Sequence, residues 1–190
     1  LEGILEEMID ILEKAQCEDG YLNTYYTIKE PEKRFTDFAY GHELLNCGNF
    51  TEAAVAYFLA TGRTRFLNIM VKNVNLIMDF VMNSEEYIYP GHEELEIALV
   101  KLYRVTGEKS YLDLAKRFID TRGEGESIFA KQDNFALGGK KDNRYFQLDY
   151  QQAHAPVREQ KEATGHAVRA AYLYTAMAMV AEESGDSSLF

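Results

Sequence analysis

The feature that most constrains the fold of this sequence is a repeat that opens with glycine and histidine. Three of the four histidines directly follow a glycine. They stand in the pairs Gly41-His42, Gly91-His92 and Gly165-His166. Each pair opens an apolar-rich segment with helical spacing, and each segment ends in a small-residue turn that closes with a glycine. These closing glycines are Gly62, Gly107 and Gly185. A glycine directly after a helical pattern is typical of a helix C-terminus.

A second helix is predicted after each of the first two turns. Apolar residues with helical spacing mark it at about residues 65–82 and, after the second turn, at about residues 109–121. A similar pattern predicts a helix at the start of the chain, and its members are Ile4, Leu5, Met8, Ile9 and Leu12. Because one helical hairpin cannot bury its own apolar face, repeated hairpins indicate a solenoid or a closed α/α barrel. The sequence therefore predicts an all-α fold.

The repeat also predicts where three histidines lie. In a closed ring of hairpins, the equivalent inner helices all start at the same end, so we expect His42, His92 and His166 to form a histidine rim there. The helix macrodipole disfavours imidazolium at a helix N-terminus, so neutral imidazoles that donate and accept hydrogen bonds are expected. Such groups suit sugar hydroxyls. A single histidine near a helix start is more often a cap or a packing residue, but three equivalent ones favour a shared function.

Charge and composition exclude several classes of function. A net charge of −11 repels nucleic-acid phosphates and anionic lipids, so neither is an expected partner. No apolar run approaches the ~20 residues that are needed to cross a bilayer. The two cysteines, Cys17 and Cys47, lack metal-ligand spacing and are expected to be ordinary buried or half-buried thiols. The sequence leaves the compartment open between bacterial cytoplasm and periplasm.

Two long connections lack a helical pattern. Residues 18–41 are rich in tyrosine and phenylalanine and carry turn signals at Asp19-Gly20 and Pro31. Aromatic rings on a loop can stack on sugars, but they more commonly anchor the loop to the core. Residues 122–153 are glycine-rich, and so long a connection is typical of a functional insertion. We interpret both as loop insertions in one barrel domain over residues 1–190, the second partly covering the rim.

Seven short stretches carry a resemblance to a known family. They are residues 19–25 (DGYLNTY), 42–44 (HEL), 89–93 (YPGHE), 99–107 (LVKLYRVTG), 111–115 (YLDLA), 154–160 (HAPVREQ) and 165–170 (GHAVRA). In this order, and along nearly the whole chain, they resemble the β-L-arabinofuranosidase-type glycoside hydrolases of bacteria. One such stretch alone is weak evidence, whereas the ordered set is specific.

The resemblance implies an (α/α)6 barrel followed by β-rich domains, and hydrolysis of terminal β-linked L-arabinofuranose from plant-derived glycans. It also implies zinc, which in that family holds a cysteine thiolate that acts as nucleophile, while a glutamate is the acid/base. Those groups belong to a Glu-x-Cys motif, a Cys-Cys pair and a glutamate just ahead of them, all expected beyond Phe190. We therefore expect an N-terminal part of the barrel with both ends cut, no catalytic residue, no bound zinc and no activity alone.

The resemblance carries over only the sugar-binding part of the site. His42, His92 and His166 match histidines that look like substrate contacts of the family, and Glu43 and Tyr21 are weaker candidates.

Three other residues of the matching stretches receive structural interpretations. His154 is predicted to tie down the long loop, and Arg158 and Glu159 are predicted to form an internal ion pair.

Alternative functions stay open at this stage. Glu43 and Glu93 stand beside rim histidines and suggest a two-carboxylate glycosidase site, although the helix dipole alone explains glutamates at helix starts. A non-catalytic helical-repeat or carbohydrate-binding scaffold is a second alternative. Another α/α-barrel sugar enzyme is a third, but an acidic sugar calls for an Arg/Lys cluster that is not evident. An incomplete barrel exposes inner-helix surface, so self-association through that surface is expected.

Overall fold

The computed structural model describes residues 2–131 and 148–190, and within them the protein is helical without a strand. The helices are α1 (Glu2–Ala15), α2 (Thr24–Lys29), α3 (Glu43–Thr61), α4 (Arg65–Met82), α5 (Leu95–Thr106), α6 (Lys109–Thr121), α7 (Ile128–Lys131) and α8 (Ala167–Ser184). Three 3-10 turns complete the set, namely η1 (Pro31–Lys33), η2 (Val157–Glu159) and η3 (Ser187–Leu189). The predicted all-α fold is confirmed.

The glycines that close the repeat units end their helices as predicted. Gly62, Gly107 and Gly185 follow α3, α5 and α8 with φ of 72°, 74° and 73°, in the left-handed region. Each donates its N–H to the carbonyl four residues earlier, as Gly62 does to Phe58 at 2.7 Å. A side chain at this φ is strained, so glycine makes these helix ends sharp.

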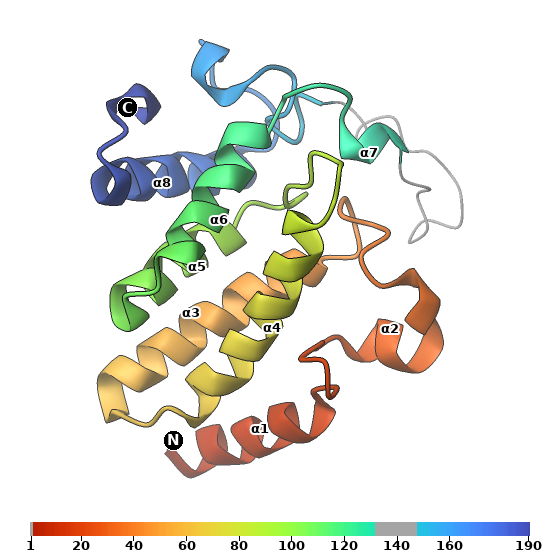
Figure 1. The fold of residues 1–190 in the computed structure, drawn as a ribbon, viewed down its shortest axis with the longest axis vertical. Helices are drawn as coiled ribbons and strands as arrows, with labels where there is room; N and C mark the ends of the chain where they lie inside the picture. Colours follow the sequence, from red (N-terminus) through yellow and green to blue (C-terminus); the bar gives the residue numbers. More distant parts are fainter. Residues whose placement is uncertain (1, 132–147) are drawn as a thin grey trace.

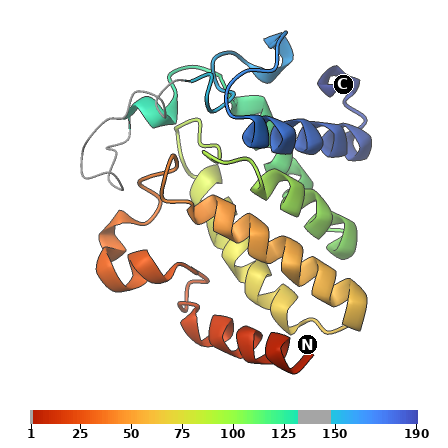
Figure 2. The same cartoon turned by 180° about the vertical axis from the view of Figure 1, so that it is seen from behind.

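The helices form two layers that follow one another along the chain. Figures 1 and 2 show α3, α5 and α8 side by side in one layer, and α1, α4 and α6 in the other. The helices of one layer run opposite to those of the other, since short turns join α3 to α4 and α5 to α6. The described parts of the long connections lie at the opposite end of the helices, on the right and at the top in Figure 1. This arrangement is that of consecutive hairpins of an α/α barrel.

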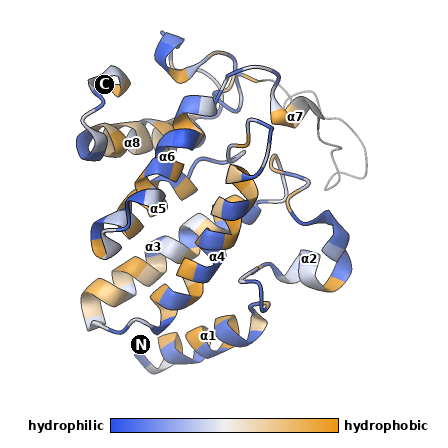
Figure 3. Cartoon of the chain, in the orientation of Figure 1, coloured by the Kyte–Doolittle hydropathy of each residue, from blue (hydrophilic) through white to orange (hydrophobic). Residues whose placement is uncertain are grey.

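The two layers are held together by the apolar faces of their helices. α5 lies in the middle and is buried on nearly every side, with Ala98, Leu99 and Val100 fully buried. The second-layer helices are amphipathic: α4 buries Met70, Val74 and other apolar residues at helical spacing. In Figure 3, hydrophilic and hydrophobic residues accordingly alternate around α4 and α6.

The first helix is less buried than its sequence pattern indicates. Ile9 is its only buried residue, whereas Ile4 and Met8 are 60% and 51% exposed. Among the long helices, α4 is the one against which α1 mainly packs. Its apolar pattern therefore predicted the helix but not how much of it packs.

The connection over residues 18–41 is anchored by its aromatic residues, as expected for the commoner of the two interpretations. Phe35 stacks on Phe80 of α4, with ring centroids 4.7 Å apart, and Tyr21 meets the Phe35 ring edge-on at 5.5 Å. The segment also forms α2 and η1, which the sequence did not predict. Of the second predicted insertion, residues 132–147 lie outside the described residues. None of the described helices has the length and apolar character needed to cross a membrane.

Candidate functional site

The three rim histidines lie at the same end of the first helical layer, where the long connections gather. His42 and His166 are the residues directly before α3 and α8, and His92 lies three residues before α5. The charges of His42 and His166 both affect His92, so the three imidazoles are near one another. The structure thus brings together residues that are 124 positions apart at the extremes (166 − 42).

The glycine before each rim histidine is required by close packing of the backbone. A Cβ atom at Gly41 would lie 2.5 Å from the carbonyl oxygen of Asp37. A Cβ atom at Gly91 or Gly165 would collide with the carbonyl oxygen of Phe38 or Asp149. At each Gly-His pair, therefore, a backbone carbonyl of a loop lies in close contact with the glycine just before the histidine.

Each rim imidazole is half-buried and has one nitrogen that is not satisfied internally. Within the described residues, the Nδ1 atoms of His42, His92 and His166 are buried and have no hydrogen-bond partner. Unpaired buried polar atoms cost free energy, so they are rare unless a site needs them. Two rings have aromatic neighbours: Tyr172 lies edge-on to His92 and Tyr150 to His166, each with centroids 5.3 Å apart.

The surroundings keep His42 and His92 uncharged. Burial lowers the pKa of His92 to about 4, with the nearby charges of Arg169 and His42 adding to the effect. Burial and then Arg169 also lower the pKa of His42. At neutral pH both are neutral imidazoles, each able to donate one hydrogen bond and accept another.

Glu43 and Tyr21, the weaker candidates for sugar contact, are bound to each other. The Tyr21 hydroxyl donates to Glu43 Oε1, and the Phe35 N–H approaches both carboxylate oxygens at 2.9 and 3.1 Å. Both side chains are buried. Burial raises the pKa of Glu43 to about 7, while the hydrogen bonds from Tyr21 and Phe35 oppose that rise. This pair fixes the 18–41 connection to the start of α3, and its contact with a sugar stays a prediction.

Glu93, the partner of Glu43 in the two-carboxylate alternative, is part of a separate buried cluster. It is fully buried, and one of its carboxylate oxygens lies 3.0 Å from Nη1 of Arg122. Arg122 also lies 3.5 Å from Glu96 and donates to the carbonyl oxygens of Gln151 and Pro90 at 2.9 and 2.7 Å. Because neither Glu43 nor Glu93 is open to solvent, the pair does not form an accessible two-carboxylate site.

Sequence reasoning missed the two arginines that organise this end of the protein. Arg122 is fully buried, and Arg169 in the first turn of α8 is 6% exposed. Arg169 donates from Nη1 to the carbonyl oxygen of Gly91 and to Gln151 Oε1. The one available signal was that Arg169 stands three residues after His166, which places both on the same side of a helix start.

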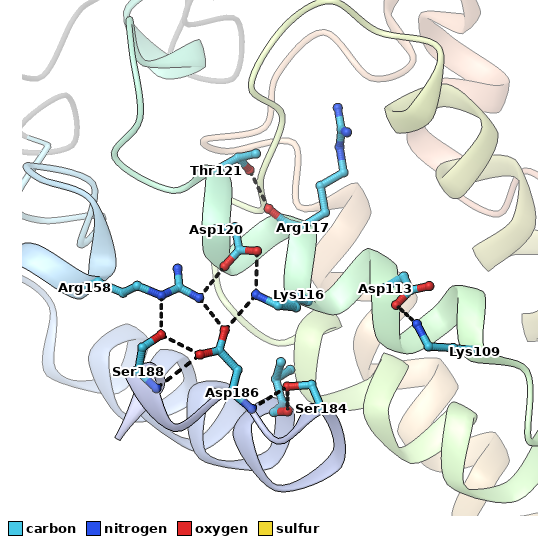
Figure 4. A network of polar contacts seen from close by, with 11 residues as sticks. Lys109, Asp113, Lys116, Arg117, Asp120, Thr121, Arg158, Ser184, Asp186 and Ser188 are labelled. Carbon is cyan, nitrogen blue, oxygen red and sulfur yellow. Dashed lines mark hydrogen bonds and ion pairs between the residues drawn. The ribbon is translucent and has the colours of Figure 1, made fainter.

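Two structural interpretations from the sequence are corrected. Arg158 does not pair with Glu159 but with Asp120 and Asp186, at 2.7 and 2.9 Å, and with the Ser188 hydroxyl (Figure 4). The pairing joins the η2 turn to α6 and to the end of the chain, because those segments meet in space.

His154 is exposed, and within residues 2–131 and 148–190 it forms no hydrogen bond or ion pair that ties the long loop down. There the loop is held by two glutamines: Gln152 donates to the Thr164 carbonyl at 2.9 Å, and Gln160 donates to the Gln152 and Ala155 carbonyls at 2.8 Å.

The cysteines are ordinary thiols, as predicted. Both are free, Cys47 is buried and Cys17 is half-buried. Burial raises the pKa of Cys47 to about 12, which is the opposite of what a metal-bound thiolate needs. Within residues 2–131 and 148–190, no three His, Cys, Asp or Glu side chains come together as a metal site does.

A cavity of about 590 Å³ runs along the first helical layer beside the rim. Its wall includes Tyr172, the neighbour of His92, together with Val168, Ile97 and the polar side chains of Glu52 and Lys101. A mostly apolar cavity with a few polar groups is the usual setting for a small ligand. His42 lines a different cavity, so a cavity common to all three histidines stays a prediction.

Comparison with known proteins gives a consistent result. The sequence matches the catalytic domain of the GH127 β-L-arabinofuranosidases over residues 1–190. A non-reducing end β-L-arabinofuranosidase of Bifidobacterium longum subsp. longum is 38% identical over 198 aligned residues. The alignment covers 100% of this chain and 30% of the relative, so the chain spans about a third of that protein's length.

Solved structures show the same likeness. A GH127 β-L-arabinofuranosidase from Geobacillus stearothermophilus T6 is 49% identical, with a TM-score of 0.89 over 99% of this chain and 30% of its own. A second GH127 β-arabinofuranosidase is 40% identical, with a TM-score of 0.78 over 98% of this chain and 28% of its own. A third structure, described as a glycoside hydrolase, has a TM-score of 0.72 at 29% identity and covers 99% of this chain and 26% of its own.

Proposed function

This chain belongs to the family of GH127 β-L-arabinofuranosidase catalytic domains, and we propose that it forms the sugar-binding end of a glycosidase that releases terminal β-L-arabinofuranose. His42, His92 and His166 are the proposed sugar contacts, and Tyr21 and Glu43 are the weaker candidates for contact. Three of the four relatives named above are called arabinofuranosidases, and this chain covers 30% of the curated one. Catalysis is therefore proposed for the longer assembly to which such a chain contributes.

The observation that carries the proposal is the meeting of three half-buried imidazoles at one end of one helical layer. A pentose presents several hydroxyl groups, each of which can donate and accept a hydrogen bond. Neutral imidazoles match such groups because they too donate and accept. Because the Nδ1 atoms are buried, we assign contact with the sugar to the exposed part of each ring.

The charges near the rim favour a neutral sugar over an acidic one. Arg122 and Arg169 lie close by, although no Arg/Lys cluster was evident in the sequence. Both are buried, and Nη1 and Nη2 of Arg122 and Nη1 of Arg169 already bind carbonyl, amide or carboxylate oxygens. The two arginines are thus poorly placed to form an ion pair with a carboxylate group of a ligand. This argues against an uronic acid substrate.

The resemblance also implies zinc, and we propose that the described residues of this chain do not hold it. Cys47 is buried as a neutral thiol, and the described residues hold no metal-type cluster. We therefore propose that a zinc-bound thiolate and the acid/base glutamate come from other parts of the assembly, and we assign no catalytic residue in this chain. Metal analysis of the purified chain tests this, with less than one zinc per chain expected.

The proposal is tested by sugar binding to the chain itself. Methyl β-L-arabinofuranoside is expected to bind weakly, because a few hydrogen bonds at a partly open site leave little surplus over the costs of binding. Saturation-transfer NMR detects such weak binding. The signal should vanish in a His42→Ala/His92→Ala double variant and persist in His154→Ala, the matched control at an exposed histidine. A signal that survives the double variant would refute the rim as the binding site.

The main alternative is a carbohydrate-binding scaffold without catalysis. A chromogenic β-L-arabinofuranoside separates the cases when the chain is tested alone, because no hydrolysis is expected from it. Clear turnover that disappears in His42→Ala and Glu43→Ala would transfer the chemistry to the carboxylates in this chain. If a longer protein containing this segment binds the sugar but does not cleave it, the scaffold is the correct assignment.

We also propose that the chain self-associates through the cavity face of α3, α5 and α8. The exposed apolar side chains there include Val168 of α8, which is 51% exposed. Burying apolar area on association is favourable. Sizing chromatography coupled to light scattering should give a mass above that of one chain. A strictly monomeric species at high concentration would contradict this.

A further inference from the structure

We propose that Arg169 is the positioning residue of the histidine rim: it joins the segments that carry the rim histidines and holds one fixed positive charge beside His42 and His92, so that these two meet a ligand as uncharged groups. This inference rests on the proposed sugar-binding function of the rim and adds to it a residue that touches no sugar. It adds the buried guanidinium to burial as a cause of the uncharged state of His42 and His92.

The contacts of Arg169 connect separate parts of the rim. Nη1 donates to the carbonyl oxygen of Gly91, the residue directly before His92. The same nitrogen donates to Gln151 Oε1, and the guanidinium lies 5.1 Å from the centre of the Tyr150 ring. Tyr150 in turn lies edge-on to His166. One side chain on α8 therefore touches the segment of His92 and the loop that flanks His166.

The third histidine is joined to this unit through the backbone. The Gly91 N–H donates to the Phe38 carbonyl oxygen at 3.1 Å, four residues before His42. Gly91 thus accepts from Arg169 on one side and donates to the His42 segment on the other. A shift of Arg169 would move Gly91 and through it both segments.

Arg169 is the positively charged side chain that affects the pKa of two rim histidines, His42 and His92. It lowers the pKa of both His42 and His92, second only to burial. Asp37, in the loop before α3, opposes it at His42, and His42 and His166 add to it at His92. Arg169 itself interacts with a wider set of titratable groups, which are Glu93, Tyr150, Arg122 and Tyr40.

The position of Arg169 explains why a cation is tolerated and useful there. The guanidinium cannot lose its proton in a protein, so its charge is permanent. Burial strengthens its repulsion of imidazolium, because the effective dielectric constant is lower than in water. Neutral imidazoles keep an acceptor nitrogen for a sugar hydroxyl, whereas imidazolium has only donors. The charge therefore serves binding of hydroxyl groups without touching the ligand.

The test is an NMR titration of the histidine rings in the ring-labelled 190-residue chain. In the unmodified chain, His42 and His92 should titrate below the ordinary histidine value of 6.5, and His92 near about 4. If both titrate at or above 6.5, the proposal is overturned without any variant.

Two substitutions separate charge from structure. In Arg169→Met, the pKa of His92 and of His42 should rise toward the ordinary value of 6.5. In Arg169→Lys, which keeps a cation but loses the forked guanidinium, the two pKa values should stay closer to those of the unmodified chain. Unchanged titration in a folded Arg169→Met chain, or an equal rise in both variants, would overturn the proposal. If Arg169→Met does not fold, as judged by circular dichroism, the unmodified chain and Arg169→Lys still decide.

A second experiment, in which the sugar is added, tests the proposed function separately from the role of Arg169. Methyl β-L-arabinofuranoside is added to the unmodified chain, and shifts of the His42 and His92 ring signals are expected at neutral pH and weaker shifts near pH 4. If the titrations behave as described but no ring signal responds to the sugar, the role of Arg169 holds and the proposed ligand is wrong. If the rings respond but Arg169→Met changes no pKa, the ligand holds and the role of Arg169 is wrong.

Discussion

Replacing Arg122 by methionine should be one of the most damaging single changes in this protein. The guanidinium is fully buried and contacts the carboxylates of Glu93 and Glu96 and the carbonyl oxygens of Gln151 and Pro90. Methionine fills much of the same volume but carries no charge and no donor. Two buried carboxylates and two carbonyls would then lose their common partner.

The size of the loss follows from these contacts. Breaking a buried ion pair by removing one partner costs about 3–5 kcal/mol, because the remaining charge is left uncompensated. Each carbonyl that loses its hydrogen bond adds about 1–3 kcal/mol if it stays buried and unpaired, but these terms are not additive within one cluster. A loss of about 3–5 kcal/mol is therefore expected above pH 8, where Glu93 is ionised beside Arg122 in the unmodified chain, and this is a large part of the ~5–15 kcal/mol that stabilises an ordinary domain.

The loss should depend on pH in a definite direction. Burial raises the pKa of Glu93 to about 8 and also raises that of Glu96, although Arg122 acts to lower both. A group whose folded-state pKa is raised stabilises the fold below its unfolded pKa, here 4.5, and loses that contribution as pH rises through the folded pKa. Without Arg122 both carboxyls hold their protons more tightly. The loss relative to the unmodified chain should therefore be smallest near pH 5 and largest above pH 8, the folded-state pKa of Glu93 in the unmodified chain.

Urea unfolding followed by circular dichroism measures this at both pH values. Lys109→Met is the matched control, because Lys109 lies at the start of α6, the helix that ends directly before Arg122, and among the described residues it pairs with Asp113 at the surface (Figure 4). Adding Glu93→Gln to Arg122→Met should restore part of the lost stability at the higher pH, since it removes one unpaired charge. The reasoning fails if Arg122→Met loses no more than the control, or if its loss is the same at both pH values.

Three smaller experiments test the core, the rim backbone and the thiols. Leu99→Ala, at a fully buried position of α5, should cost about 2–5 kcal/mol of unfolding free energy in the same urea assay; a loss below 1 kcal/mol would mean that α5 is not central. Gly91→Ala should weaken methyl β-L-arabinofuranoside binding, because the added Cβ collides with the Phe38 carbonyl and displaces the rim; unchanged binding would contradict the close approach. Cys17 should react with a disulfide reagent much faster than Cys47, which is buried and whose pKa is raised to about 12, and equal rates would argue against the packing of α3.

Much of this fold is determined locally and was therefore predictable from the sequence. The helices at 65–82 and 109–121 begin and end where apolar spacing indicated, and the turn glycines adopt the left-handed conformation that only glycine reaches without strain. Apolar spacing and turn glycines determine the backbone over a few residues, so these helices can be predicted from neighbouring positions in the sequence. The Gly-His repeat extended the prediction to tertiary structure because equivalent helices in a ring of hairpins start at one end. Seven ordered stretches identified the family for the same reason, as each one is a short pattern.

Tertiary structure decided which charged residues are buried and with which partners. Arg122 and Arg169 look like ordinary surface arginines in the sequence, yet each is bound by segments far away along the chain. Arg158 forms ion pairs with Asp120 and Asp186 rather than with its neighbour Glu159, because folding places the end of α6 and the segment after α8 next to it. Local patterns set backbone conformation, since φ and ψ respond to nearby atoms. The partner of a buried charge depends on which distant segments meet, and only the folded chain contains that information.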